Sequence, residues 1–217
     1  MTPRPYRAGE RKRAVDEGRA RILEAARSVL HLNDIAAFSL DAVAQKAGVT
    51  RMTVYNQFGS RAKLLQELFD LMVERDAFSK MPVVLEAPDA VTGFDEFVAI
   101  LGRFYTDNRA VIARLSAAAG IDPDLDAAMR TRNERRLHVI ELLLKRLVQD
   151  YEPTLPARDL AKSVDVLLNF PTFNALAGPD RAPKDAVPLV RQLLRGLWGT
   201  PKRPSARTKR AKPRSGG

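Results

Sequence analysis

The sequence predicts an all-α protein with a small N-terminal helix-turn-helix domain and a larger helical domain, about nine helices in all. Apolar residues recur at helical spacing, no convincing strand alternation is found, and prolines and glycines punctuate the helical segments. An apolar content of 45% allows a sizeable core. We expect four segments: a disordered basic arm (1–18), the helix-turn-helix domain (19–66), the helical domain (67–199) and a disordered basic tail (200–217).

The N-terminal domain is expected to hold three helices and the start of a fourth. The first presents an apolar face over residues 22–30. The second follows Ser39 and the third starts at Thr50, because both residue types commonly cap helix N-termini. The third helix ends near Phe58, and the fourth carries apolar residues over 64–73.

Five further helices are expected beyond a linker bracketed by Pro82 and Pro88. A proline inside a helical pattern opens the hydrogen-bond ladder, so Pro171 should bend the fourth of them. Their approximate ranges are 93–106, 108–119, 123–151, 157–177 and 184–198.

The net charge of +10 is unevenly distributed along the chain. Residues 1–20 and 21–66 each carry +3, residues 67–199 carry −3, and residues 200–217 carry +7. A basic excess confined to the N-terminal quarter and the tail indicates a polyanionic partner that meets one part of a two-part molecule. For the tails alone, charge that only keeps the chain ends soluble is an equal alternative.

Several classes of protein are excluded or disfavoured. The absence of cysteine excludes disulfides and thiolate metal sites and fits a cytoplasmic protein. No secretory signal and no run of about 18 apolar residues is found, so we expect no membrane segment. His31 and His138 are far apart in sequence, and no Gly-rich phosphate loop or Ser-His-Asp arrangement is apparent. We expect no metal, no cofactor and no enzymatic activity.

Residues 39–58 have the pattern of a helix-turn-helix. Ala44 is small where the two helices meet, and Gly48 can take a positive φ in the turn. Apolar plugs lie beneath the pair: Val43, Val49, Val54 and Phe58. The other face offers donors, acceptors and methyl groups suited to base edges in a major groove: Arg51, Met52, Thr53, Tyr55, Asn56 and Gln57. An ordinary helical hairpin with a solvated polar face is the alternative.

The segment RILEAARSVL…FSLDAVAQKAGVTRMTVYNQFGSRAKLL, residues 21–65, resembles the DNA-binding domain of the TetR family of bacterial regulators. Its most specific part is AGVTRMTVYNQF followed by S-R-x-x-L. The resemblance implies a repressor that binds a palindromic DNA operator as a homodimer and is released by a small-molecule effector. A non-specific architectural DNA-binding protein is the alternative that the basic tails leave open.

The resemblance also implies roles for individual residues at the DNA. Phosphate contacts would come from helix starts and from the end of the third helix: Ser39, Thr50, Gln57 and Arg61. Arg51, Met52 and Thr53 would face bases, and Tyr55 would lie against the backbone or a thymine methyl. The Asn56-Gln57 pair departs from the aromatic or His pair that is common in the family.

In the family, the larger domain binds a small molecule between its helices and forms the dimer. Candidate apolar contacts here are Phe97, Leu101, Phe104, Phe170 and Phe173, although an aromatic stripe at helical spacing is usually plain core. Candidate polar contacts are Arg114, Arg132, His138 and Asn169. Residues 157–198 would pack against the same segment of a second protomer and form a four-helix bundle with it.

Overall fold

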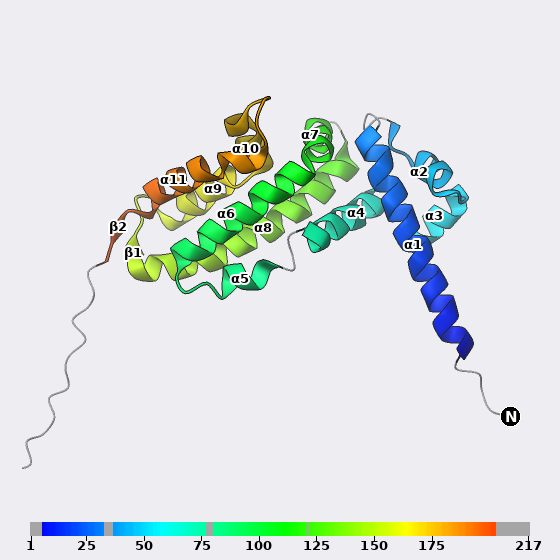
Figure 1. Ribbon diagram of the computed structural model, residues 1–217, viewed down its shortest axis with the longest axis horizontal. Helices are drawn as coiled ribbons and strands as arrows, with labels where there is room; N and C mark the ends of the chain where they lie inside the picture. Colours follow the sequence, from blue (N-terminus) through cyan, green and yellow to red (C-terminus); the bar gives the residue numbers. More distant parts are fainter. Residues whose placement is uncertain (1–5, 33–36, 77–79, 121, 203–217) are drawn as a thin grey trace, which may run out of the picture.

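The computed structural model describes residues 6–32, 37–76, 80–120 and 122–202. These residues include eleven α-helices, a 3-10 helix at 183–186 and a two-stranded antiparallel ribbon. Figure 1 shows an elongated molecule with the N-terminal helices gathered at one end and the ribbon at the other. The all-α fold with an N-terminal helix-turn-helix is confirmed.

The N-terminal end is built from three helices that share a core with the start of the fourth. Ile22, Val43, Val54 and Leu64, one from each helix, are fully buried in it. The helices are α1 (Tyr6–Leu32), α2 (Leu40–Ala47), α3 (Arg51–Phe58) and α4 (Arg61–Asp76). Because α4 packs on both α1 and α8, it joins this end to the larger helical body.

The larger body is centred on two long helices, α6 (Ala90–Asp107) and α8 (Pro123–Asp150), which lie side by side (Figure 1). Shorter elements surround this pair: α5 (Met81–Leu85), α7 (Arg109–Ala118), α9 (Ala157–Leu167), α10 (Phe170–Ala177), the 3-10 helix η3 (Pro183–Ala186) and α11 (Val187–Trp198). The buried apolar side chains of both ends form one continuous cluster.

The expected disordered arm is wrong over residues 6–18, which are helical and continuous with α1. The segment contains mainly Arg, Ala, Glu and Lys, which are good helix formers, and no proline after Pro5. Extending an existing helix adds one hydrogen bond for each residue fixed and needs no new nucleus. Residues 1–5 lie outside the described residues.

The expected single helix over 157–177 is also wrong, because it is two helices. α9 ends at Leu167, and Asn169 caps α10 by accepting a hydrogen bond from the Thr172 N–H at 2.9 Å. Pro171 lies in the first turn of α10, where its missing N–H costs nothing. The proline therefore marks a helix start and not a bend within one helix.

Two short elements were not expected. Helix α5 lies in the segment expected to be a linker, and its Val84 is buried. Strand β1 (Tyr151–Glu152) pairs with β2 (Thr200–Pro201), so the first residues of the expected tail are ordered against the body. Gly199 permits this approach, because a Cβ there would lie 1.9 Å from the Glu152 carbonyl oxygen. Residues 203–217 lie outside the described residues.

Candidate nucleic-acid interface and pocket

The turn between α2 and α3 has the geometry that the sequence predicts. Gly48 adopts φ 68°, and the Val49 N–H that follows donates to the Ala44 carbonyl at 3.0 Å. Ser39 and Thr50 cap their helices, accepting hydrogen bonds from the backbone N–H groups of Ala42 and Thr53, both at 3.1 Å. The caps fix where each helix begins, and therefore which side of α3 faces outward.

The outward side of α3 is unusually exposed for its residue types. Met52 is 62% exposed and Tyr55 is 54% exposed, and Arg51 and Asn56 are also exposed. The Arg51 guanidinium lies 3.6 Å from the Asp41 carboxylate, with both side chains largely in solvent. Such a pair contributes little and can exchange partners readily. This face therefore offers a donor, an amide, a phenol and a thioether to a large partner.

Gln57 is not part of that outward face. Its side chain is half-buried next to α1, where its Nε2 would lie 3.6 Å from a Cβ at Gly18. Arg19, which the sequence reasoning missed, holds this corner together. Its guanidinium donates to the Gln57 carbonyl at 2.9 Å, stacks 4.4 Å from the Phe58 ring centroid and pairs with Glu67. No local pattern signals Arg19, because its partners are far away in sequence.

Arg61 is engaged inside the protein. Its Nε donates to the Phe38 carbonyl at 2.9 Å, and its Nη1 lies 2.6 Å from an Asp122 carboxylate oxygen. Asp122 is the N-cap residue of α8, where its carboxylate also accepts from the Leu125 N–H at 3.2 Å. Arg61 thus connects α4 to the long helix of the larger body.

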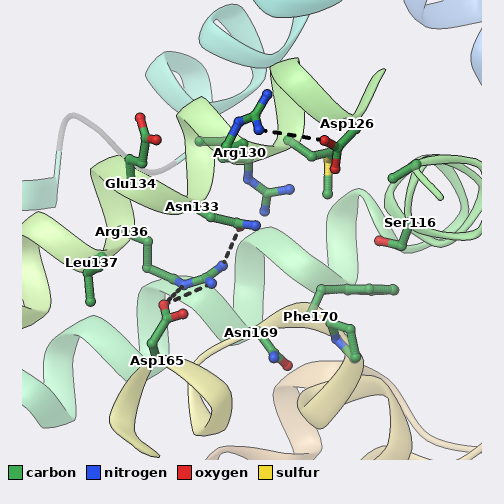
Figure 2. A pocket seen from close by; sticks show the side chains of 14 residues that line it. Ser116, Asp126, Arg130, Asn133, Glu134, Arg136, Leu137, Asp165, Asn169 and Phe170 are labelled. Atoms are coloured by element: carbon green, nitrogen blue, oxygen red, sulfur yellow. Dashed lines mark hydrogen bonds and ion pairs between the residues drawn. The ribbon is translucent and has the colours of Figure 1, made fainter. Parts of the chain in front are cut away.

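A cavity of about 550 Å³ lies in the larger body between α7, α8, α9 and the start of α10. Figure 2 shows Arg136 of α8 facing Asp165 of α9 at its wall. Three of the residues expected at a ligand line this cavity: Arg132, Asn169 and Phe170. Most of the remaining wall comes from α8, including Met129, Asn133 and Arg136, which the sequence reasoning did not single out.

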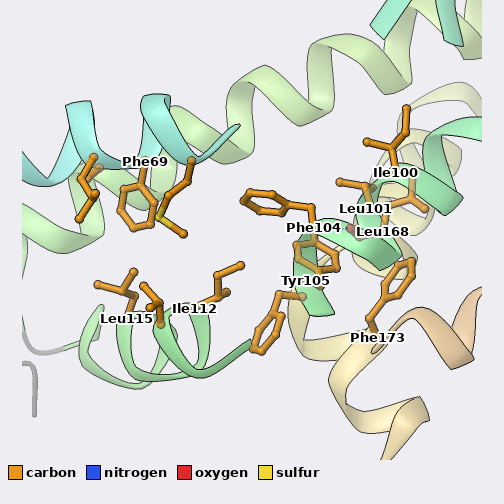
Figure 3. Close-up of a cluster of buried hydrophobic side chains, with 14 of the residues drawn as sticks. Phe69, Ile100, Leu101, Phe104, Tyr105, Ile112, Leu115, Leu168 and Phe173 are labelled. Atoms are coloured by element: carbon orange, nitrogen blue, oxygen red, sulfur yellow. Dashed lines mark hydrogen bonds between the residues drawn. The ribbon is translucent and has the colours of Figure 1, made fainter. Parts of the chain in front are cut away.

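The other candidate ligand residues do not line the cavity. Figure 3 shows Leu101, Phe104 and Phe173 in the packed core, and Phe97 is buried as well. His138 is exposed on α8. Arg114 donates to the Leu30 carbonyl at 2.9 Å and to the His31 carbonyl, at the C-terminus of α1. A cation is favourable at a helix C-terminus, so Arg114 connects α7 to the N-terminal domain.

Within the described residues, no group of three or more His, Asp or Glu side chains could hold a metal ion. In the same part of the chain, no helix has the length and apolar run needed to cross a membrane.

The fold and the exposed face of α3 define a helix-turn-helix protein with an additional helical domain that contains a cavity. Residues 22–68 match the family model of bacterial regulatory proteins of the tetR family. The N-terminal segment is therefore similar to the DNA-binding domain of the tetR family, as the resemblance in its sequence predicted.

Named relatives are transcriptional regulators, and solved structures share the fold. The transcriptional regulator AlkX of Mycobacterium tuberculosis is 32% identical over 111 residues, 48% of this chain and 49% of AlkX. The chain thus spans about half the length of that relative. TtgR of Pseudomonas putida, also a transcriptional regulator, is 38% identical over 63 residues, 29% of this chain and 30% of TtgR. These relatives are named as regulators and not as enzymes, as expected for this chain.

Among solved structures, NalD is described as the secondary repressor of the MexAB-OprM multidrug efflux pump in Pseudomonas aeruginosa. It superposes with a TM-score of 0.61 at 19% identity, over 85% of this chain and 97% of NalD. A transcriptional regulator from Saccharomonospora viridis, solved in complex with choline, gives 0.61 at 20% identity, over 83% of this chain and 94% of that chain. At such identities these likenesses show a shared fold.

Proposed function

We propose that this chain is a transcriptional repressor that binds a palindromic operator as a homodimer and is released by a small molecule. The observation that carries the proposal is the outward face of α3, where Arg51, Met52 and Tyr55 are exposed on a helix capped by Thr50. A second helix of a helix-turn-helix reads base edges from the major groove with such residues. A repressor of this kind acts where the chromosome is, in the bacterial cytoplasm.

On binding, DNA would replace weak contacts that exposed side chains make within the protein. Arg51 can leave Asp41 for a base, since both are exposed and 3.6 Å apart. Thr50 and Ser39, at helix N-termini, are placed to meet phosphates, because helix N-termini attract anions. Met52, Thr53 and Asn56 would complete the contact. Gln57 and Arg61 would reach phosphates only after leaving their internal positions.

Ligand release is supported by the double role of α8. The helix supplies much of the cavity wall, and its N-cap residue Asp122 holds Arg61 of α4. A ligand that favours a different placement of α8 would therefore shift α4 and the helix-turn-helix of α2 and α3 that packs with it. A similarly folded regulator was solved in complex with choline, which supports a small-molecule ligand for a protein of this fold.

Dimer formation is supported by an exposed apolar surface on α9 and α11. Val166 is 57% exposed, and Leu189 and Leu193 are 42% and 41% exposed. Val166 and Leu193 line one shallow groove together with Leu167 and Leu197. Contiguous apolar surface of this kind marks an interaction site, and two reading heads are needed to cover two half-sites.

The proposal is tested by selecting bound duplexes from a random pool with the full-length protein. We expect an inverted repeat to emerge and to bind about 10³-fold or more tightly than its scrambled counterpart at physiological salt. Tyr55→Ala should reduce that preference by about 1–3 kcal/mol, while Lys63→Ala, an exposed change on α4, serves as the control. Equal binding of selected and scrambled duplexes would favour the architectural alternative.

A further inference from the structure

Arg132 of α8 lines the cavity with a cation that has no carboxylate partner among the described residues. Its guanidinium carbon lies 5.1 Å from the ring centroid of Phe104 and 5.8 Å from that of Tyr105. Burial lowers the pKa of Arg132 below its ordinary value; Tyr105 opposes this change and the nearby Arg136 charge adds to it. Ring faces attract a cation, but they replace only part of its lost hydration.

The other arginines of the cavity wall already have acidic partners. Arg136 donates from Nε to Asp165 at 2.9 Å and from Nη1 to the Asn133 side chain at 3.1 Å (Figure 2). Arg130 lies 3.9 Å from Asp126, its neighbour one helical turn earlier. Arg132 is therefore the arginine of this wall whose charge is left to be balanced by something else.

The three carboxylates of the wall disfavour a ligand that carries several negative charges. Asp126, Glu134 and Asp165 all border the cavity and would repel a ligand carrying several negative charges. A monoanion would meet the one unpaired guanidinium. The planar fork of an arginine also matches a carboxylate, which can accept two parallel hydrogen bonds from it.

The rest of the wall suits an apolar ligand body. Met129, Leu137, Phe170 and Pro171 contribute apolar surface, and the volume of about 550 Å³ falls in the range of small-molecule sites. Ser116 and Asn169 add polar groups that can orient a ligand (Figure 2).

We infer that the effector is an organic monocarboxylate with an apolar body, and that Arg132 binds its carboxylate. The inference rests on the proposed ligand response and adds the chemical class of the ligand. It also implies that the free protein holds a half-buried cation without a carboxylate partner among the described residues, so an anion should bind here more tightly than a neutral molecule of the same shape.

The test uses full-length protein and two matched probe pairs, octanoate with octanamide and 2-naphthoate with 2-naphthamide. Binding is measured by calorimetry, and the melting temperature is recorded with and without each probe. We expect each carboxylate to bind at least about 10-fold more tightly than its amide, a difference of about 1.4 kcal/mol. Choline, a cation, should bind more weakly than either carboxylate.

The variants are Arg132→Met and, as the matched control, Arg130→Met, since both arginines line the cavity from α8 but only Arg130 has an acidic partner. Arg132→Met should erase the preference for carboxylate over amide. Its ligand-free melting temperature should be equal to or above that of the unmodified protein, because a half-buried cation without a carboxylate partner is removed. Arg130→Met should keep the preference.

Equal binding of carboxylate and amide, failure of both carboxylates to bind, or a preference that survives Arg132→Met would overturn the inference. Operator binding measured with the same probes separates it from the proposed function. If amides or choline release the operator and carboxylates do not, the proposed ligand-responsive repressor is supported and the carboxylate site at Arg132 is contradicted. If carboxylates bind through Arg132 without affecting operator binding, the carboxylate site is supported and the ligand-responsive repressor is contradicted.

Discussion

Arg61 and Asp122, which are 61 positions apart in the chain, meet at 2.6 Å and join the first residue of α4 to the N-cap of α8. About three quarters of each side chain is buried, because 24% and 25% of their surfaces remain exposed. Partial burial and a second hydrogen bond from Arg61 to the Phe38 carbonyl set this pair apart from an ordinary surface ion pair. The pair directly connects the N-terminal helix-turn-helix domain to α8, the helix that lines the cavity.

The first prediction concerns the energy of this connection. In a double-mutant cycle of Arg61→Met and Asp122→Asn, we expect a coupling of about 0.5–1 kcal/mol in the free energy of unfolding. The Arg130 and Asp126 pair, 3.9 Å apart and largely exposed, is the matched control and should show coupling near zero. Denaturant unfolding of the four proteins in each cycle measures both values. Indistinguishable couplings in the two cycles would mean that the Arg61 contact contributes nothing special.

The second prediction is the pH dependence of the same pair. Burial raises the pKa of Asp122, but the hydrogen bonds from Arg61 and the Leu125 N–H and the Arg61 charge outweigh it, so the pKa is lowered from 3.8. A carboxyl group with a lowered pKa in the folded state stabilises the fold above its unfolded pKa. That contribution is lost as the pH falls through the folded value.

Accordingly, the unmodified protein should be more stable than Asp122→Asn at pH 7, and the difference should shrink as the pH falls below 3.8. Unfolding curves of both proteins between neutral pH and the acid limit of folding provide the measurement. A difference that grows toward low pH would contradict the sign of the pKa change.

The third prediction concerns the reading face of α3. Arg51→Ala and Tyr55→Ala should each cost about 1–3 kcal/mol in operator binding and much less in binding to scrambled DNA, because both residues lie on the exposed face. Gln57→Ala should have a smaller effect on specificity, since Gln57 faces α1 at Gly18. Competition binding with operator and scrambled duplexes measures these losses. If Arg51→Ala or Tyr55→Ala still discriminates fully between the two duplexes, that residue does not contact bases.

Arg61 remains predicted as a phosphate contact only through the family resemblance. If Arg61 contacts phosphate, Arg61→Ala lowers the slope of log affinity against log salt by about one. An unchanged slope, together with a measurable coupling between Arg61 and Asp122, would show that Arg61 joins α4 to α8 and does not contact phosphate.

Local structure could be predicted from the sequence where it depends on residues that are close together in the chain. Ser39, Gly48 and Thr50 act on residues within a few positions, so their capping and turn roles could be read from the chain. Asp122 lies 61 positions from Arg61, and Leu30 lies 84 positions from Arg114, so a linear pattern carries no information about these contacts.

The same limit applies to the cavity. Helical periodicity identifies buried aromatic residues but does not separate a core residue such as Phe173 from a cavity-lining one such as Phe170. That distinction depends on how α7, α8 and α10 pack against one another. The break between α9 and α10 was missed because Pro171 is compatible both with a bent helix and with a helix start.

The fourth prediction tests the close packing of α6 on η3 and on the first residue of α11. A Cβ at Gly102 would lie 2.5 Å from a Val187 methyl and 3.3 Å from the Lys184 Cα. Gly102→Ala should therefore destabilise the fold by about 1–3 kcal/mol, despite the better helix propensity of alanine. Gly9→Ala, in α1 with nothing within 4 Å of the added Cβ, is the control and should not destabilise. Equal melting temperatures for Gly102→Ala and the unmodified protein would show that η3 shifts at no cost.

The last prediction concerns the dimer. The exposed Val166 and Leu193 line one groove between α9 and α11, whereas Leu194 is buried in the core of the same protomer. A charge at Leu194 would unfold the protomer and would say nothing about its partner. Val166→Glu combined with Leu193→Glu instead puts two carboxylates on the surface of the folded protomer. In a dimer they would be buried without partners, which is strongly unfavourable.

We therefore expect the double variant to be a folded monomer by light scattering, with a far-ultraviolet circular dichroism spectrum matching that of the unmodified protein. Operator affinity should fall steeply, because a single reading head covers only one half-site. Val83→Glu is the matched control, since Val83 on α5 has the same 57% exposure as Val166 but lies outside the groove. It should leave the dimer intact. A dimer that survives Val166→Glu with Leu193→Glu would place the interface on another surface, and dissociation by Val83→Glu alone would place it at α5.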